Sequence, residues 1–345
     1  LAANSGRWSA SFHSLPSGSP MRSIIIPRRP NHVLVHADYS ALEVTVLARV
    51  TGDRNLIQVF LDGKDIHRYA ASKIFEKPEA EITSEERRFS KACSFSILYG
   101  KGVESFAFDN TGGDVQKAQA IFDAFFKQFP GIKEFIHKAH AEIDRTNAYV
   151  TTMLGNKVPI DVNAGGGAKY RQAQNQIIQS LGSLVAGTSM YQFLEYCEKQ
   201  GYDCAPYAFT HDAYDDSTSV DTIFEYLEGM EEVMVNRVRQ SVGIPVSIDY
   251  ELAANGRDLC SIDFTPREQY ERTVTIKGTS IAIEGLLSRL KLSKTYDLED
   301  VEIETSEPED YGWSELWGVG KALKYEWGKT IQQSKATFKV KYRKN

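Results

Sequence analysis

The chain has 345 residues, of which 42% are hydrophobic and 11% aromatic, which is the composition of a globular protein with one or two cores. Its formal charge of 40 − 46 = −6 excludes the strong overall basicity that is typical of proteins that bind the phosphate backbone. Any contact with nucleic acid therefore has to be made by a local group of basic residues. No apolar run approaches the roughly 18 residues of a membrane span, and no secretory leader opens the chain. The four cysteines lack zinc-binding spacing. We therefore expect a cytoplasmic protein with reduced thiols and no membrane contact.

The first thirty residues hold many Ser and Pro residues, which predict loops or short strands. From His32 onward apolar and polar residues alternate, which predicts a strand ending at Asp38. Between Ser40 and Arg49 the apolar spacing becomes helical. This part of the sequence predicts a strand, a sharp corner and a helix, with an aspartate beside the corner.

Residues from about Asp53 to Val150 predict an almost wholly helical region, followed by a hairpin in TTMLGNKVPI and a long amphipathic helix at about 169–200. Asp212 then lies between two β-favouring arms, which predicts a strand, a tight turn and a strand. A helix at about 220–241 and the strand VSIDYEL follow. We expect helices and an antiparallel sheet in one α+β protein.

After about Phe264 the sequence changes character. Residues 297–310 contain eight acidic residues and no basic one, whereas the last eleven residues are rich in Lys and Arg. We interpret residues 264–345 as a small appended α+β extension of unknown role, with a solvated acidic loop.

The segment EITSEERRFSKACSFSILYG predicts a helix with a well-defined start, because Thr83 and Glu86 have the spacing of a capping box. At 100° per residue Arg88, Lys91, Phe95 and Tyr99 share an arc of about 80°. This stripe spans about 16 Å, the length of a nucleoside triphosphate. Cations near the N-terminus suit phosphates, and aromatics further on suit the base and sugar. An ordinary amphipathic helix with core aromatics and snorkelling cations is the alternative.

Three local strings carry a resemblance to a known family. RRFSKACSFSILYG resembles motif B of family A DNA polymerases, R-x-x-x-K-x-x-x-[FY]-x-x-x-YG. HADYSALEV resembles motif A, D-Y-S-x-[IL]-E, and FTHDAY resembles motif C, V-H-D-E, and the three follow the family's order. The resemblance implies the polymerase right hand: a palm with an antiparallel sheet and helices, and mostly helical fingers.

The chemistry of phosphoryl transfer and the resemblance together assign the catalytic residues. Two divalent ions have to activate the attacking hydroxyl and stabilise the leaving group, and Mg²⁺ takes carboxylates and phosphate oxygens. The resemblance makes Asp38 and Asp212 the ligands of two Mg²⁺ ions, with the backbone carbonyl of Tyr39 completing one site. It also makes Glu43 the steric gate against a 2′-hydroxyl and places His211 by the primer terminus.

The resemblance assigns the nucleotide contacts to the fingers. Lys91 would bind the phosphates and could protonate the leaving pyrophosphate, and Arg88 would hold the triphosphate tail. His67, in a segment that matches G-K-D-I-H-R, is a second phosphate contact. Phe95 and Tyr99 would define the sugar and base pocket.

Weaker matches extend the resemblance over residues 5–263 and imply DNA contacts. Arg7, in SGRWSASFHSLP, is a candidate minor-groove contact. RQAQNQIIQS resembles the palm helix that approaches template and primer, and its candidate contacts are Arg171, Asn175 and Gln179. Motif C departs from the family, because Ala213 stands where a glutamate is usual; Ala41 and Thr45 are departures in motif A. Such divergence resembles that of bacteriophage polymerases.

These assignments divide the chain into four parts: palm with motif A at 1–52, fingers with motif B at 53–168, palm with motif C at 169–263, and the extension at 264–345. The implied partners are primer-template DNA and deoxynucleoside triphosphates in a bacterial or phage-infected cell. Since no thumb or 3′–5′ exonuclease is recognisable before residue 5, we expect a separate chain or a missing segment to supply the thumb and perhaps the exonuclease.

Three alternatives remain open. A single-subunit RNA polymerase shares the palm and the motif order, but Glu43 and Phe95 argue against it. A non-catalytic DNA-binding subunit with the same fold is favoured by Ala213. A His-Asp metal phosphohydrolase is suggested by His211 and Asp212 together with residues 137 and 140, which are both histidines.

Overall fold

The computed structural model describes residues 19–305 and 333–343, so that Arg7 lies outside the described residues. It contains helices and a large antiparallel sheet, which confirms the predicted α+β class. The described residues form two compact units. We call them the helical unit, with residues 41–189 and 235–247, and the sheet unit, with residues 19–40, 190–234, 248–305 and 333–343. Within the described ranges, no helix combines the length and the apolar character needed to cross a membrane.

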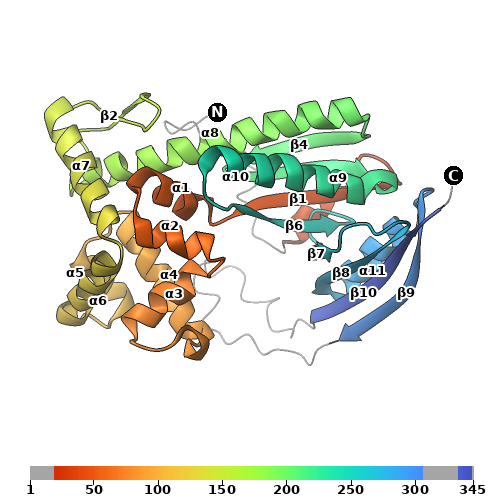
Figure 1. Ribbon diagram of the computed structural model, residues 1–345, viewed down its shortest axis with the longest axis horizontal. Helices are drawn as coiled ribbons and strands as arrows, with labels where there is room; N and C mark the ends of the chain where they lie inside the picture. The colour runs from red at the N-terminus through yellow and green to blue at the C-terminus, as the bar shows by residue number, and fades with distance from the viewer. Residues whose placement is uncertain (1–18, 306–332, 344–345) are drawn as a thin grey trace. The chain divides into compact units, whose positions relative to one another are not determined.

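The helical unit confirms the largely helical pattern that the sequence predicts. Seven helices precede a short hairpin of β2 (Tyr149–Thr151) and β3 (Lys157–Pro159) and the start of the long helix α8 (Ala168–Gln200) (Figure 1). The seven are α1 (Leu42–Thr51), α2 (Arg54–Leu61), α3 (Ile66–Ile74), α4 (Ser84–Leu98), α5 (Val103–Asn110), α6 (Val115–Gln128) and α7 (Pro130–Thr146).

Polar side chains fix where these helices begin. Asp53, Asp65 and Asp114 each accept a hydrogen bond from a backbone amide in the first turn of α2, α3 and α6. At α4 the predicted capping box is present: the amide of Glu86 donates to Thr83 Oγ1 at 3.2 Å, and the amide of Thr83 donates to Glu86 Oε2 at 2.9 Å. The start of the motif B helix is therefore set by its own sequence.

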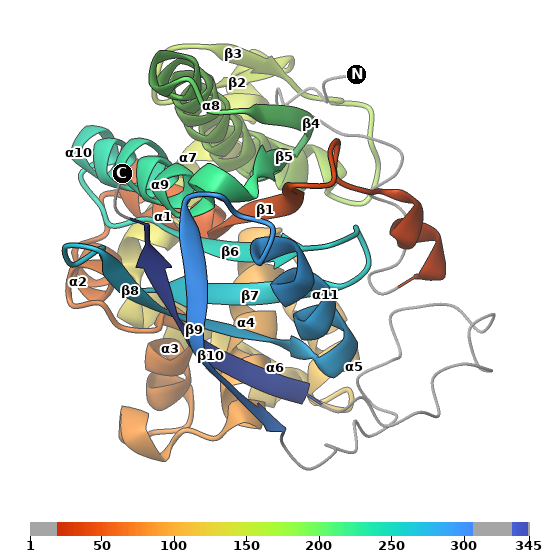
Figure 2. The same cartoon turned by 90° about the vertical axis from the view of Figure 1, so that its right-hand side faces the viewer.

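The sheet unit is built on one eight-stranded sheet in the order β4-β5-β1-β6-β7-β8-β10-β9 (Figure 2). Its helices are the end of α8, α9 (Ile223–Met230) and α11 (Ser280–Leu290). The strands are β1 (His32–Ser40), β4 (Cys204–Thr210), β5 (Ala213–Ser219), β6 (Ser247–Ala253), β7 (Leu259–Phe264), β8 (Glu271–Thr279), β9 (Tyr296–Thr305) and β10 (Gln333–Tyr342).

Two predicted elements differ from the structure. The strand expected to end at Asp38 continues to Ser40. The single helix expected at 220–241 is a 3₁₀ turn, α9, a π-helical turn at Glu231–Asn236 and α10 (Arg237–Val242). Apolar spacing could not reveal this break, because a π turn inserts a residue without ending the apolar face.

The predicted acidic loop is wrong in its first part, because residues 296–305 form strand β9. Three lysines of β10 and the arginine directly after it pair with these acids, which removes the repulsion expected of an isolated acidic run. The ion pairs are Lys335–Glu304 at 3.6 Å, Lys339–Asp300 at 2.9 Å, Lys341–Glu299 at 3.2 Å and Arg343–Asp297 at 2.6 Å. Strands β8, β10 and β9 continue the sheet that holds β1 and β5, and the four-part domain division stays a prediction.

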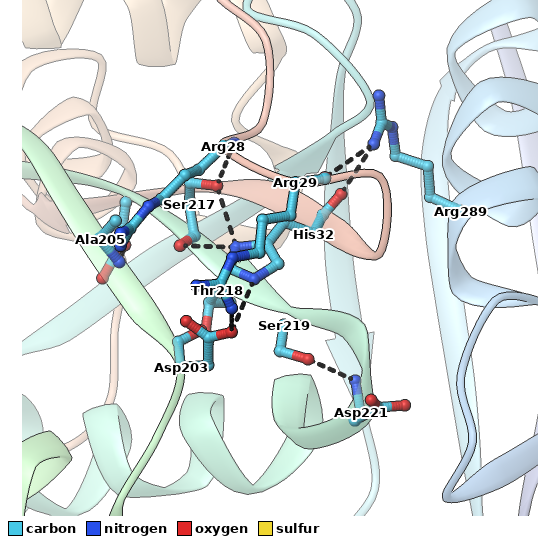
Figure 3. A network of polar contacts seen from close by, with 11 residues as sticks. Arg28, Arg29, His32, Asp203, Ala205, Ser217, Thr218, Ser219, Asp221 and Arg289 are labelled. Carbon is cyan, nitrogen blue, oxygen red and sulfur yellow. Dashed lines mark hydrogen bonds and ion pairs between the residues drawn. The ribbon is translucent and has the colours of Figure 1, made fainter.

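Helix α11 holds the loop that leads into β1 (Figure 3). Arg289 of α11 donates through Nη1 to the carbonyl of Pro30 at 3.0 Å and to that of His32 at 3.1 Å. The His32 side chain is fully buried and lies 3.2 Å from Asp203 Oδ2 through Nε2. The segment after residue 264 thus fixes the entry of the strand that carries motif A.

A buried cation joins β8 to α9. The Arg272 guanidinium lies 3.0 Å from Glu228 Oε1 and within cation–π range of two phenylalanine rings, Phe224 at 5.2 Å and Phe264 at 5.8 Å. Its side chain has no exposed surface, whereas Glu228 is 39% exposed. Among the described residues its nitrogens make no aligned hydrogen bond, so the ion pair and the rings hold the charge.

This asymmetry predicts that the two partners of the pair respond differently to neutralisation. Glu228→Gln leaves a fully buried charge without its counter-ion and should destabilise the protein by about 2 kcal/mol. Arg272→Met fills a similar volume and leaves a carboxylate that water can solvate, so its cost should stay below about 1.5 kcal/mol. Urea unfolding of both variants measures the difference, and an equal or reversed order would contradict this account.

Candidate catalytic site and nucleotide-binding helix

The antiparallel pairing of β1 and β5 sets the backbone geometry around Asp38. Asp38 lies opposite Ala213 in the register, and Asp212 is the residue directly before Ala213. Directly paired Cα atoms lie about 4.5–5.5 Å apart and consecutive ones 3.8 Å, so the Cα atoms of the two aspartates lie within about 9 Å. The structure therefore brings the backbone positions of the two aspartates together within the sheet unit.

Asp212 occupies a tight turn between β4 and β5. Thr210 pairs with Ala213, so His211 and Asp212 are the two residues of the turn. His211 has a φ of 58°, a left-handed conformation that is uncommon for a residue other than glycine. The positive φ at the first turn residue is typical of a type II′ turn, whose twist matches that of the strands it joins.

Other charged groups surround Asp38. Burial raises the pKa of its carboxyl above the ordinary value, and the nearby carboxylates of Asp249 and Asp215 raise it further, whereas His36 and His211 act in the opposite direction. Burial by itself would lower the pKa of His36, but a 2.7 Å hydrogen bond between its Nδ1 and Asp215 Oδ1 leaves it raised. Negative charge is thus concentrated around Asp38.

Oxygen ligands and this excess of negative charge fit Mg²⁺, which uses one or two carboxylates together with substrate phosphates rather than a closed protein cage. Within residues 19–305 and 333–343, no group of three or more His, Cys, Asp or Glu could hold a metal ion on its own. Tyr39, whose backbone carbonyl the sequence proposes as a ligand, follows Asp38 in β1, and its hydroxyl donates to the Met234 carbonyl at 2.6 Å.

Four residues that accompany Asp38 were not predicted from the sequence: His36, Asp215, Asp249 and Glu251. His36 lies two residues before it on the same strand face and pairs in register with Asp215, while Asp249 and Glu251 come from the neighbouring strand β6. The period of two along β1 could have revealed His36. The other three required the strand order, which the sequence does not contain.

The helical unit aligns the predicted nucleotide-binding residues along α4. The Lys91 Nζ lies 5.8 Å from the centre of the Phe95 ring, and this ring stacks on Tyr99 with centres 5.9 Å apart and planes 13° from parallel. The Tyr99 hydroxyl donates to the Glu43 carboxylate at the start of α1. Arg88, a turn before Lys91, is exposed. Cation, aromatic rings and proposed gate residue form a continuous row.

His67 of α3 lies against this row. Its ring centre is 5.8 Å from that of Phe95, and only 6% of the residue is exposed. Burial lowers the pKa of His67 to about 4, and the neighbouring cations Lys91 and Arg87 also lower it, against the opposing effect of Asp65. In this state the side chain is a buried neutral imidazole.

The proposed DNA contacts on α8 share one helix face, because Arg171, Asn175 and Gln179 follow at intervals of four residues. Arg171 is exposed, and the other two are partly exposed. The Arg171 Nη1 donates to the carbonyl of Gly166 at 2.7 Å in the loop before α8.

The architecture is that of a polymerase domain. The solved structure of the POL domain of Pol1 from M. smegmatis in complex with DNA primer-template and dNTP matches with a TM-score of 0.66 and 22% identity, over 74% of this chain and 46% of that one. The sequence profile of DNA polymerase family A matches residues 12–258, and the chain belongs to this family. The predicted family and fold are confirmed.

The similar proteins are DNA polymerases. DNA polymerase I of Streptococcus pneumoniae is 32% identical over 57% of this chain and 23% of its own length, and that of Chloroflexus aurantiacus is 29% identical over 74% and 28%. The DNA polymerase of Mycobacterium phage D29 is 36% identical over 38% and 21%. The chain thus matches only about a quarter of the length of these relatives.

The raised pKa of Asp38 predicts a pH-dependent stability. An acid whose pKa is higher in the folded state destabilises the fold when it is ionised, and this cost disappears as the pH falls toward its ordinary value of 3.8. Asp38→Asn should therefore raise the melting temperature at pH 7 in EDTA, and the gain should shrink toward pH 4. Asp263→Asn, at an exposed aspartate, is the matched control, and thermal melts with equal shifts for both variants would contradict the prediction.

The buried imidazole predicts a second pH effect. A histidine with a lowered pKa resists protonation in the folded state, so stability is lost progressively as the pH falls from 6.5 to about 4. His67→Gln should remove up to about 3 kcal/mol of this loss. Urea unfolding of both proteins at pH 7 and pH 4.5 measures the effect, and parallel pH profiles would show that His67 is solvated.

Proposed function

We propose that this chain is the catalytic module of a DNA polymerase that adds deoxynucleotides to a primer 3′-hydroxyl by two-metal phosphoryl transfer. The observation that carries the proposal is the register of β1 and β5, which places the aspartates of motifs A and C at adjacent backbone positions. Membership of DNA polymerase family A supports the same reaction.

Asp38, Asp212 and the carbonyl of Tyr39 would hold two Mg²⁺ ions, which supply Lewis acidity at the attacking and leaving oxygens. The protein residues do the positioning. Strand β1 carries Asp38, and the turn that leads into the neighbouring strand β5 carries Asp212. His36 and His211 offset part of the negative charge that Asp215 and Asp249 place around Asp38. His211 would lie by the primer terminus.

Lys91, Arg88 and His67 would bind the triphosphate, and Lys91 could give a proton to the departing pyrophosphate. His67 can contribute charge only if phosphate binding overcomes the burial that keeps it neutral. Phe95 and Tyr99 offer stacked ring faces to the base and sugar. The Tyr99 hydroxyl holds the Glu43 carboxylate, which supports its role as the gate that excludes a 2′-hydroxyl.

Primer-template DNA would contact α8 through Arg171, Asn175 and Gln179, and the candidate Arg7 lies outside the described residues. The M. smegmatis protein is in complex with DNA primer-template and dNTP, which supports the same partners here. A separate thumb or exonuclease and the cytoplasm of a bacterial or phage-infected cell stay predictions.

Two alternatives can be weighed. The DNA polymerases among the relatives favour a DNA product over the RNA product of a single-subunit RNA polymerase. A non-catalytic subunit is favoured by one observation: Ala213, where the family has a glutamate, lies directly opposite Asp38. The register places Asp215 two residues further along the same face of β5, so a carboxylate remains on that face.

Primer extension with Mg²⁺ tests the proposal, without and with an added thumb chain. Asp212→Asn should reduce the rate at least about 10²-fold, because it removes half of the charge that holds the metals, whereas Asp263→Asn should leave it unchanged. Glu43→Ala should increase ribonucleotide incorporation relative to deoxynucleotide. Full activity of Asp212→Asn would eliminate the proposal, and tight DNA binding without extension under any metal would establish the non-catalytic subunit.

A further inference from the structure

The C-terminal end of α4 is held by a buried glutamine of α8. Gln174 is 1% exposed, and its Nε2 donates to the carbonyl of Leu98 at 2.6 Å and to that of Ile97 at 3.3 Å. Carbonyls in the last turn of a helix lack intrahelical partners and need others. A side chain from the helix that carries the proposed DNA contacts therefore completes the end of the helix that carries the proposed nucleotide contacts.

Gly100 lets the two helices approach this closely. Its φ is +73°, which favours glycine, and a Cβ atom there would lie 2.8 Å from Arg171 Cγ and 3.1 Å from Gln174 Nε2. Gly100, which directly follows Tyr99, therefore lies against Arg171, one of the proposed DNA contacts. Any other residue type would adopt this φ with strain and would have to displace the side chains of Arg171 and Gln174.

A histidine of α7 fixes the orientation of the glutamine. His140 Nε2 lies 3.1 Å from Gln174 Oε1, and the His140 ring lies 4.8 Å from the Tyr170 ring. Burial lowers the pKa of His140, so the ring is neutral at pH 7. Since the amide nitrogen already faces two carbonyls, Oε1 accepts a hydrogen bond from the Nε2–H group of His140. The three helices α4, α7 and α8 meet at this one amide.

We propose that Gln174 is a positioning residue that couples DNA contact on α8 to the placement of Tyr99 at the nucleotide-binding end of α4. The inference rests on the proposed function, and it adds a residue that contacts neither substrate. Tyr99 directly follows Leu98, whose carbonyl Gln174 holds, and it is also bonded to Glu43. A shift of α8 on binding DNA would be transmitted through this amide to the row of Lys91, Phe95 and Tyr99.

A purely structural role makes a different prediction. If Gln174 only completed a helix end, its loss would lower stability and leave nucleotide binding unchanged. The test therefore compares Gln174→Met, which keeps the length and removes the hydrogen bonds, with Ile177→Val, which trims a buried residue one turn away and leaves them intact. His140→Phe keeps a ring against Tyr170 and removes the hydrogen bond to Gln174 Oε1 but leaves those from Gln174 to α4, so it is the milder variant.

Steady-state single-nucleotide extension gives the first readout. Gln174→Met should raise the KM for the deoxynucleotide about tenfold, with the DNA Kd, measured by fluorescence anisotropy, unchanged within about twofold. His140→Phe should shift the KM in the same direction by a smaller factor, and Ile177→Val should leave it unchanged. Equal KM values for Gln174→Met and Ile177→Val, or a parallel loss of DNA affinity in Gln174→Met, would overturn the inference.

Hydrogen exchange separates this inference from the proposed function, because it needs no catalysis. The amides of Tyr99, Gly100 and Lys101 are bonded to Phe95, Ile97 and Ser96 carbonyls at 2.8, 3.0 and 2.8 Å. They should exchange faster in Gln174→Met than in Ile177→Val, and primer-template should slow them in the wild type but not in Gln174→Met. If primer-template binds the wild-type protein and does not slow the exchange of these amides, the proposed coupling is wrong. Failure of the wild type to bind DNA or extend a primer would instead reject the proposed function.

Discussion

The pairing of β1 with β5 is the constraint on which the proposed catalytic site depends. Along β1 the buried Val35, Ala37 and Tyr39 alternate with the partly exposed His36 and Asp38. A slip of one residue would exchange the two faces and bury the aspartate in the core. The apolar side chains thus fix the register by their own burial, and the same register places Asp38 opposite Ala213, next to Asp212. The packing of the apolar face of β1 thus determines where Asp38, on the opposite face, lies.

The segment after residue 264 protects this arrangement rather than standing apart from it. Strands β8, β10 and β9 continue the sheet, so that β7 is paired on both sides instead of forming an open edge. Arg289 bonds the loop before β1, and Arg272 joins β8 to α9 through Glu228. Burying the charge of Asp38 lowers the stability of the fold. The contacts of Arg289 and Arg272 stabilise the same sheet unit and offset this loss.

Helix starts and turns could be predicted from the sequence, because they depend on residues that are close in the chain. Contacts between residues far apart in the chain could not be predicted. The capping box of Thr83 and Glu86 and the turn at Asp212 involve neighbours in the chain, so composition and spacing could indicate them. Strand β9 was mistaken for a loop because its acidic residues are neutralised by lysines of β10 more than thirty positions later. The contact between Gln174 and Leu98 likewise joins residues 76 positions apart, and no periodicity reports it.

Strained backbone lies beside both aspartates. Ala41, at the corner between β1 and α1, has a φ of 57°, and His211, directly before Asp212, has a φ of 58°. Each left-handed residue other than glycine costs about 1–2 kcal/mol and persists only where the surrounding structure imposes it. Ala41 joins the end of β1 to the start of α1, which carries Glu43, and His211 is one of the two residues within which the chain reverses from β4 to β5. Relaxing either corner would move a proposed catalytic carboxylate, which explains why the strain is retained where the proposed chemistry occurs.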